Sequence, residues 1–489
     1  MSDKYVDYVK ARVMPAPQRM EVLNGTFRIS DGCKITLRSS VDESAIVARR
    51  FLESWNVRPE ITFIPEDVSI ARDGYNLEVT ETECFISASN ESGVLNAISV
   101  LRQLEEAERG VMTSSCWHVP CVRIHDYPAL AFRGIHICWF PETPSWEIEK
   151  LIRLAAHFRY NVVVLESWGV IQLDSHPEFC WKEHAVPKTE IQRLVKLAAS
   201  LGITLCPQVN IFGHGTASRV IAAKHVLLDT HPEYASLYEA DGWTWCISNP
   251  FTRKYLTDMV VEMHGLFDNP PYFHIGCDEA YNAGNCSLCH EGYPQRFKEY
   301  LLYFHDLLAA RGSRSMMWHD MLLHENDERW KGYITSGNPD IVPDTFLQEL
   351  PKDMLICDWQ YYYPKETDGP EPSWPTMKAF QQAGFDVLAC PWLNRDGIAS
   401  IGRCAAENKF FGLLETTWNF MQGTPNFHTA FALAGTAAWN AFAEPVCNVN
   451  LTQYTAHAVR RICRDMGLKN YTQFGTAQFQ IPPFPTPCC

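Results

Sequence analysis

The spacing of hydrophobic residues changes close to residue 125. Before that point, Phe27–Leu37 and Tyr75–Ser87 alternate apolar and polar residues, as half-buried strands do. Two further segments, Val41–Trp55 and Ser92–Glu106, carry apolar residues on one face at helical spacing. Neither predicted helix presents polar groups that converge on one point. We therefore predict that residues 1–125 form a small, non-catalytic α/β domain that packs against the next one.

From Ala131 onward, short apolar runs alternate with amphipathic helices. Pro128 separates the two patterns, because the residue before a proline favours an extended backbone. The predicted strands are Phe132–Cys138, Asn161–Leu165, Thr204–Val209, Phe273–Cys277, Met316–Trp318, Leu355–Trp359, Val387–Cys390 and Phe411–Thr416. The predicted helices are Trp146–Phe158, Ile191–Leu201, Arg253–Leu266, Pro294–Arg311, Met377–Ala383 and His428–Phe442. Eight strands with helices between them predict a (β/α)8 TIM barrel over residues 126–489, within the α/β class.

Composition narrows the classes of partner. The chain has 489 residues, enough for two domains, with 46% hydrophobic and 20% charged residues. A net charge of −15 argues against binding to nucleic acid. No apolar run is long enough to span a membrane, and the first ten residues lack the apolar core of a secretion signal. We expect a cytoplasmic protein, while an export signal trimmed from the chain stays open.

Eighteen cysteines are scattered along the chain, and we interpret most of them as reduced core thiols. Cys286-Ser287-Leu288-Cys289-His290 is the only segment that resembles a metal site. A zinc knuckle would need two more ligands, and the sequence has no second Cys-x-x-Cys. A pair of reduced thiols in a loop is the simpler interpretation. We therefore expect neither a metal nor another cofactor.

Two adjacent carboxylates, Asp278 and Glu279, follow the predicted strand Phe273–Cys277. Active sites of TIM barrels lie at the carboxyl-terminal ends of the strands. Neighbouring residues on an extended backbone point in opposite directions, so this pair offers two different chemical roles. The alternative is a solvated acidic pair that opens a loop.

Further chemical groups accompany the other predicted strands. Four strands end in Trp, although barrel interiors favour Val, Ile and Leu. An aromatic pocket with two carboxylates suits a glycoside hydrolase, because flat rings pack on sugar faces. The candidate residues, in chain order, are Arg133, Glu166, Trp168, His214, Trp318, His319, Asp320, Trp359, Tyr361, Trp392, Asn394 and Trp418.

The segment 274–279, His-Ile-Gly-Cys-Asp-Glu, resembles the His-Ile-Gly-Gly-Asp-Glu signature of glycoside hydrolase family 20, the β-N-acetylhexosaminidases. Residues 126–128 and 132–134 resemble the motif that opens the barrel of that family. The first domain is similar to the family's non-catalytic domain. The arrangement of Trp418 well before an Ala-Ala-Trp-Asn helix at 437–440 is most similar to the compact bacterial branch.

This resemblance implies an exo-acting, retaining enzyme that removes terminal β-linked N-acetylglucosamine or N-acetylgalactosamine from oligosaccharides or glycoconjugates. The substrate's own acetamido oxygen would be the nucleophile, giving an oxazolinium intermediate and no covalent bond to the protein. Glu279 would protonate the leaving oxygen and later activate water. Asp278 would hold the acetamido N–H and stabilise the positive charge. The chain gives no indication of its oligomeric state.

The resemblance also implies roles for the surrounding residues. Arg133 would bind ring hydroxyls, and the alternative is a structural ion pair. Three indoles would enclose the acetamido group and the sugar face, unless they only fill the core: Trp318, Trp359 and Trp418. Tyr361 would bond the acetamido carbonyl, with Tyr362 almost as good a candidate.

Two more roles follow in the same way. His214 would tune or brace the acidic pair, although a lone histidine is as often structural. Glu166 would hold a sugar hydroxyl.

The sequence departs from the family pattern at three places. Cys277 replaces the second glycine of the signature, and Trp418-Asn419-Phe420 lacks the acid of the usual Trp-x-Glu. Trp392-Leu393-Asn394 stands where Tyr-x-Asp is expected, which makes Trp392 and Asn394 the candidate contacts there. The preference between the two N-acetylhexosamines is therefore open.

Two rival functions remain. A carbohydrate-binding barrel without turnover would not need two adjacent carboxylates. A barrel hydrolase acting on a sugar without an acetamido group would leave Asp278 without a role.

Overall fold

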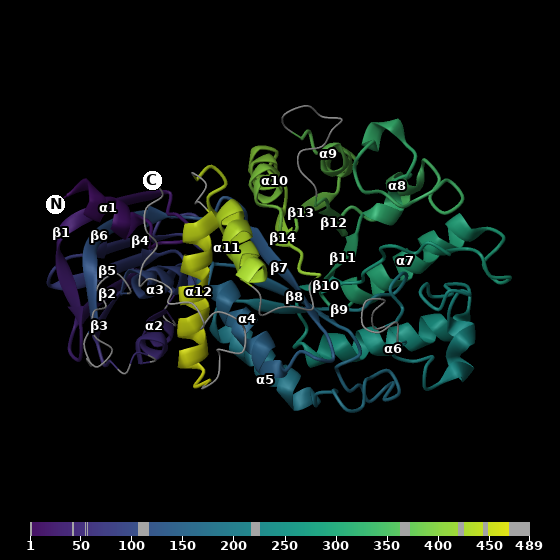
Figure 1. Ribbon diagram of the computed structural model, residues 1–489, viewed down its shortest axis with the longest axis horizontal. Helices are drawn as coiled ribbons and strands as arrows, with labels where there is room; N and C mark the ends of the chain where they lie inside the picture. Colours follow the sequence, from purple (N-terminus) through teal and green to yellow (C-terminus); the bar gives the residue numbers. More distant parts are fainter. Residues whose placement is uncertain are drawn as a thin grey trace. The chain divides into compact units, whose positions relative to one another are not determined.

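The computed structural model describes residues 2–41, 44–53, 55, 57–105, 117–216, 225–361, 372–418, 425–443 and 448–468. The chain divides into two compact units, each built from separate segments (Figure 1). The first comprises Met1–Arg133, Arg153–Tyr160 and Gly423–Cys489, and the second Gly134–Ile152 and Asn161–Gln422. The predicted boundary between residues 125 and 126 stays a prediction, because the first unit also takes in segments from later in the chain.

A mixed six-stranded sheet dominates the first unit. Its order is β1 (Arg19–Ile29), β6 (Trp117–Asp126), β4 (Tyr75–Val79), β5 (Glu83–Ala88), β2 (Lys34–Ser39) and β3 (Glu60–Pro65). β2 pairs in parallel with β5 and β3, whereas the other pairs are antiparallel. Each long strand expected from the sequence is in fact two strands. Alternation continues across the short turns, so the pattern did not reveal them.

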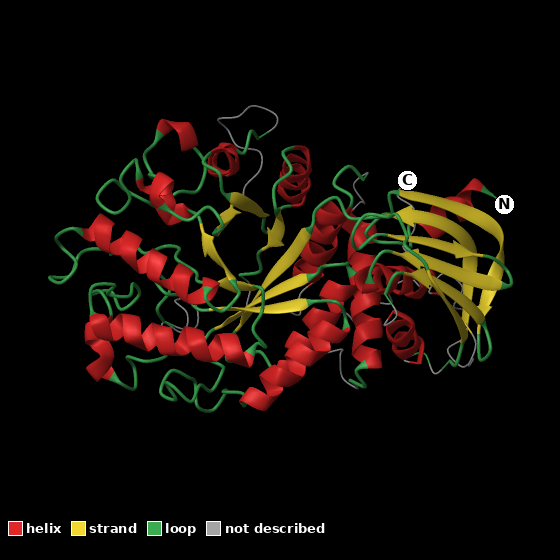
Figure 2. Cartoon of the chain, turned by 180° about the vertical axis from the view of Figure 1, so that it is seen from behind, coloured by secondary structure: helices red, strands yellow, loops and turns green. Residues whose placement is uncertain are grey.

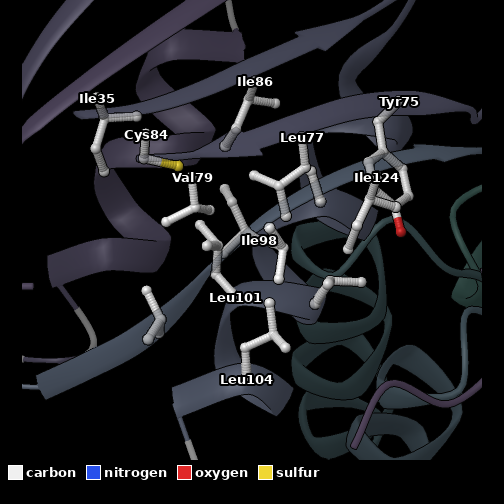
Figure 3. Close-up of a cluster of buried hydrophobic side chains, with 14 of the residues drawn as sticks. Ile35, Tyr75, Leu77, Val79, Cys84, Ile86, Ile98, Leu101, Leu104 and Ile124 are labelled. Carbon is white, nitrogen blue, oxygen red and sulfur yellow. The ribbon is translucent and has the colours of Figure 1, made fainter. Parts of the chain in front are cut away.

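The core of this unit lies between the sheet and its helices, α2 (Ser44–Glu53) and α3 (Glu91–Glu105). Figure 3 shows Ile98 and Leu101, one helical turn apart on α3, pointing toward Leu77 and Ile86 of the sheet. All four are at most 1% exposed. Burial of each such side chain contributes roughly 1.5–3 kcal/mol. The remaining helices of the unit are α1 (Asp3–Lys10), α11 (Pro425–Trp439) and α12 (Asn448–Asp465).

The other eight strands close into a barrel, which Figure 2 shows among its helices. All eight predicted strands are present, and the recorded pairs are parallel. They are β7 (Phe132–Trp139), β8 (Val162–Ser167), β9 (Thr204–Gln208), β10 (Tyr272–His274), β11 (Arg314–Trp318), β12 (Leu355–Trp359), β13 (Asp386–Cys390) and β14 (Gly412–Glu415). The helices along this part of the chain are α4 (Ser145–His157), α5 (Lys188–Ser200), α6 (Pro250–Leu266), α7 (Tyr293–Ala309), α8 (Phe346–Glu349), α9 (Pro375–Gln382) and α10 (Arg395–Glu407).

The strand that carries the acidic pair ends earlier than expected. β10 stops at His274, three residues before Cys277. Gly276 and Cys277 then take positive φ values of 69° and 80°. A β-carbon on Gly276 would lie 2.2 Å from Oδ1 of Asn210, so only glycine fits at this turn. The turn places Asp278 and Glu279 directly beyond the carboxyl-terminal end of β10.

Candidate active site

Asp278 and Glu279 share one histidine partner. Nε2 of His214 lies 3.2 Å from Oδ2 of Asp278 and 3.3 Å from Oε2 of Glu279. The two carboxylates differ in exposure, because the side chain of Asp278 is 6% exposed and that of Glu279 is 30% exposed. A buried acid and a more accessible acid beside one imidazole can perform different chemical roles.

Two of these three residues have a strained backbone. The backbones of His214 and Glu279 have positive φ values of 53° and 49°, which residues other than glycine rarely adopt. The ring of Trp243 packs 4.1 Å from that of His214, centroid to centroid. Its Nε1 also donates a hydrogen bond of 3.0 Å to the backbone oxygen of Glu279. Strained backbone of this kind is commonly found at active sites.

Electrostatics bind the histidine to the acids. Burial by itself would lower the pKa of His214, but the carboxylates of Asp278, Glu279 and Glu166 outweigh it and raise that pKa to about 10. His214 is therefore a cation at neutral pH. Burial, together with the charges of Glu279 and Glu166, raises the pKa of Asp278 against the opposing effect of His214.

Asp320 is a third carboxyl group in the same cluster. Its Oδ2 accepts a hydrogen bond of 3.1 Å from the backbone N–H of Glu279, and its Oδ1 accepts one of 3.3 Å from Nε1 of Trp359. Burial and the charge of Asp278 raise the pKa of Asp320 to about 7. Asp320 thus braces the backbone of Glu279.

Glu166 lies beside this group, with both carboxylate oxygens engaged. Nδ2 of Asn210 donates a hydrogen bond of 2.6 Å to Oε1, and Nε2 of His136 lies 3.1 Å from Oε2. Burial would raise the pKa of Glu166, yet these partners and His214 lower it. Glu166, Asn210 and His214 line one small cavity of about 40 Å³. Contact of Glu166 with a sugar hydroxyl stays a prediction.

Five of the predicted aromatic residues gather into one cluster at the strand ends, whereas Trp168 packs edge-on against His214 at 5.8 Å. The ring of Trp359 stacks on Tyr361 with centroids 5.1 Å apart, and Trp392 meets Tyr361 edge-on at 5.3 Å. Nε1 of Trp418 donates to the Tyr361 hydroxyl, and the Trp418 ring lies 5.4 Å from that of Trp318. Trp318 is fully buried, so the inner part of the cluster is core-like. Tyr362 and Asn419 lie outside the described residues.

Two stretches of the chain match known family profiles. Residues 10–127 match "Glycosyl hydrolase family 20, domain 2", and residues 159–386 match "Glycosyl hydrolase family 20, catalytic domain". The chain belongs to glycoside hydrolase family 20.

Individual relatives agree with this assignment. A Beta-hexosaminidase of Vibrio furnissii is 25% identical over 64% of this chain and 58% of its own length. A Beta-N-acetylhexosaminidase of Cellulomonas fimi is 27% identical over 44% of this chain and 46% of its own length. The matches therefore span about half of each of these two relatives. The solved structure of a Streptomyces plicatus N-acetyl-beta-hexosaminidase superimposes with a TM-score of 0.68, at 16% identity and 98% coverage of both chains.

The structure corrects the role expected for Arg133 in this family 20 chain. Arg133 is the second residue of β7, at the amino-terminal end of the strand, and is 2% exposed. Its Nη2 pairs with Oδ2 of Asp73 at 2.9 Å, and its Nε donates to the backbone oxygen of Arg159 at 2.9 Å. Substrate sites of barrels lie at the opposite strand ends. Arg133 is therefore a structural ion pair and not a sugar ligand.

Asn394 also has a structural task. It is the N-cap of α10, and its side-chain oxygen accepts a hydrogen bond of 2.8 Å from the N–H of Gly397. Trp392, two residues earlier, does join the aromatic cluster. A further contact of Asn394 with substrate stays a prediction.

Two residues of β7 contribute to the site without having been expected from sequence. The ring of His136 packs 4.5 Å from that of Trp418, and its Nε2 faces Glu166. Sγ of Cys138 lies 3.4 Å from Oε2 of the same glutamate. Their spacing of two residues toward the carboxyl end of a strand was the available signal.

Among the described residues, the longer helices all lack a stretch apolar enough to cross a bilayer.

Proposed function

We propose that this chain is an exo-acting, retaining β-N-acetylhexosaminidase. It removes a terminal β-linked N-acetylglucosamine or N-acetylgalactosamine from an oligosaccharide or glycoconjugate. The observation that carries the proposal is the placement of His214 within 3.3 Å of both Asp278 and Glu279. Membership of family 20, and relatives named as beta-hexosaminidases, support the same activity.

The proposed reaction uses the substrate's acetamido group. Its carbonyl oxygen attacks the anomeric carbon while Glu279 transfers a proton to the departing glycosidic oxygen. Bond formation and bond cleavage yield a bicyclic oxazolinium ion and the released alcohol. Glu279, now a carboxylate, removes a proton from water as that water attacks the anomeric carbon and restores the acetamido group. Two attacks on opposite faces of the ring retain the β configuration.

The environments of the two acids suit this division of work. Glu279 is the more exposed and is the one that must exchange protons with water. Burial raises the pKa of Asp278, and the adjacent His214 cation opposes that rise and favours the ionised form. An ionised Asp278 accepts a hydrogen bond from the acetamido N–H and stabilises the positive oxazolinium ion. His214 is therefore a positioning residue that keeps charge on Asp278.

The aromatic cluster supplies apolar surface for the sugar. Trp359 and Trp392 are in ring contact with Tyr361, and Trp418 donates a hydrogen bond to it. Indole faces pack on the C–H face of a pyranose and exclude water from the acetamido group. The Tyr361 hydroxyl accepts from Trp418 and can donate its own proton to the acetamido carbonyl.

Release of p-nitrophenol from the β-N-acetylglucosaminide, the β-N-acetylgalactosaminide and the plain β-glucoside tests this proposal. Wild type should cleave the acetamido sugars, and Glu279→Gln and Asp278→Asn should each lose roughly 10²- to 10⁴-fold in kcat, which includes the step in which water attacks the intermediate. Glu183→Gln, at an exposed carboxylate, is the matched control and should keep wild-type rates. A thiazoline mimic of the bicyclic intermediate should inhibit the wild type.

The other outcomes identify the rival functions. Equal turnover of the plain glucoside would indicate a hydrolase that does not use the acetamido group. Tight sugar binding without turnover would indicate a binding protein. A covalent ester between the sugar and a protein side chain, trapped during hydrolysis, would contradict the proposed intermediate.

We also propose that the protein works in a reducing compartment, as expected for the cytoplasm. All cysteines of the described residues are free thiols, and most are buried. Cell fractionation followed by detection of the chain is the direct test. Recovery in the oxidising, exported fraction would contradict this placement.

A further inference from the structure

Four side chains of metal-ligand type converge on one point away from the acidic pair. Glu239 and Cys246 come from the loop between β9 and α6, and Cys286 and Cys289 from the loop between β10 and α7. One carboxylate oxygen and three sulfurs lie within 4.8 Å of one another. Glu239, Cys246 and Cys289 are buried, and Cys286 is half-buried.

The sulfur spacing fits ligands arranged around a common centre. Sγ of Cys246 lies 3.4 Å from Sγ of Cys286 and 3.7 Å from Sγ of Cys289. Zinc-sulfur bonds of about 2.3 Å at tetrahedral angles place sulfurs about 3.8 Å apart. A disulfide needs about 2.0 Å and would join Cys246 to only one of its two neighbours.

Glu239 points independently to a cation. It is 2% exposed, and its Oε2 accepts a hydrogen bond of 2.7 Å from the backbone N–H of Cys286. Its other oxygen, Oε1, is buried and has no hydrogen-bond partner of ordinary geometry within the described part of the chain, where the Cys289 thiol is the group that interacts with this carboxylate. A buried carboxylate oxygen without a partner costs free energy. A positive ion between this oxygen and the three sulfurs would remove that cost.

We propose that Cys246, Cys286, Cys289 and Glu239 bind one zinc ion as a structural site. Thiolate sulfur selects zinc over magnesium or calcium, and carboxylate oxygen is also a zinc ligand. Four protein ligands leave no open position, so the ion would hold structure and take no part in catalysis.

Nearby donors offset the negative charge of this ligand set. The hydroxyl of Ser248 lies 3.2 Å from Sγ of Cys289 and can donate to the thiolate. Nη1 of Arg296 donates to Oγ of Ser248 at 3.3 Å and also to the backbone oxygen of Leu288. Outer partners of this kind orient metal ligands and tune their basicity.

The sequence motif lacked two ligands, and the fold supplies them. Tyr238 and Trp245 pair as an antiparallel bridge, which brings the next residues, Glu239 and Cys246, to the Cys-x-x-Cys loop. The same hairpin carries Trp243, which bonds the backbone of Glu279 and packs on His214. The zinc ion would therefore fasten the loop that positions His214 to the loop that carries Glu279.

Metal analysis of the full-length protein tests this site. Wild type purified under reducing conditions without chelator should contain about one zinc per chain by mass spectrometry of the elements. Cys246→Ser and Cys289→Ser should lose that zinc. Cys404→Ser, which removes a buried thiol of α10, is the matched control and should retain it.

Two further measurements do not depend on whether the ligand variants fold. Wild type loaded with Co²⁺ should show thiolate charge-transfer absorption and the intense visible bands of a tetrahedral site. A chelator should lower the melting temperature of wild type and of Cys404→Ser alike.

Three results would overturn the site. They are a wild type that takes up no zinc after anaerobic dialysis against Zn²⁺, zinc retained by Cys246→Ser, and a disulfide among the three cysteines. None of these readouts depends on glycoside turnover, so they are independent of the proposed function.

Discussion

Gly213 and Asp278 approach so closely that a β-carbon on Gly213 would lie 1.8 Å from the backbone oxygen of Asp278. The atom in the way belongs to the backbone and cannot rotate aside as a side chain would. This close approach brings His214, the next residue, within reach of both carboxylates. The absence of a side chain at Gly213 is thus a condition for the geometry of the site.

Gly213→Ala should therefore reduce both stability and activity. Overpacking against a fixed neighbour costs roughly 1–3 kcal/mol. Displacement of His214 from the acids should also lower kcat/KM for the p-nitrophenyl substrates. Denaturant unfolding and steady-state kinetics measure the two effects. The control is Gly265→Ala in α6, where a β-carbon meets nothing within 4 Å, and helix propensity predicts a gain of roughly 0.5–1 kcal/mol.

His214 should make stability fall as the pH rises above neutrality. Its pKa is about 10 in the folded protein, above the ordinary value of 6.5. Below pH 6.5 the imidazole is protonated in both states, whereas between 6.5 and 10 only the folded state keeps the proton. The stabilising contribution of His214 is thus complete below pH 6.5 and is lost as the pH rises through about 10.

The test compares wild type with His214→Asn, which cannot carry the charge. The difference in free energy of unfolding should shrink steadily from pH 6.5 to pH 10. His184→Asn removes an exposed imidazole and should follow the wild-type profile. A difference that stays constant over this range would contradict the charged contact with Asp278 and Glu279.

Local pattern was enough to predict the barrel and the acidic pair. Each barrel strand is a short apolar run with turn residues at its ends, and this signal needs no knowledge of tertiary contacts. Strand direction then placed Asp278, Glu279, His214 and the aromatic residues on one face. The predicted sugar contact of Arg133 was wrong, because Arg133 lies near the start of β7 and barrel substrate sites lie at the opposite strand ends.

Long-range contacts could not be predicted from spacing. Cys246 is 40 residues from Cys286, and only the hairpin closed by Tyr238 and Trp245 brings them together. The helix α10 was also missed, because Gly397 and Gly402 weaken its local helical signal. In the structure, the Asn394 cap and buried apolar residues stabilise that helix instead.

Arg133→Met should lower stability and leave substrate affinity unchanged. The change leaves the buried Asp73 carboxylate and the Arg159 backbone oxygen without their Arg133 donor. Loss of one partner of a buried ion pair costs roughly 3–5 kcal/mol. Chemical unfolding measures this loss, and KM for the p-nitrophenyl glycosides should match wild type. Arg123→Met removes an exposed pair with Glu21 and should have a much smaller effect. A large rise in KM without loss of stability would restore Arg133 as a sugar ligand.

Loss of Glu279 should affect substrates in proportion to their need for protonation. Glu279→Gln can neither protonate the leaving oxygen nor activate water, but kcat/KM reports only the steps up to bond cleavage. A series of aryl β-N-acetylglucosaminides should therefore show roughly 10²- to 10⁴-fold losses for poor leaving groups and far smaller losses for good ones. Asp278→Asn is the matched comparison, because the acetamido group must be held whichever phenol departs. Its losses should be similar across the series. If the losses of Glu279→Gln were equally uniform, the acid would have to be sought elsewhere, and Asp320, whose pKa is raised to about 7, would be the first candidate to examine.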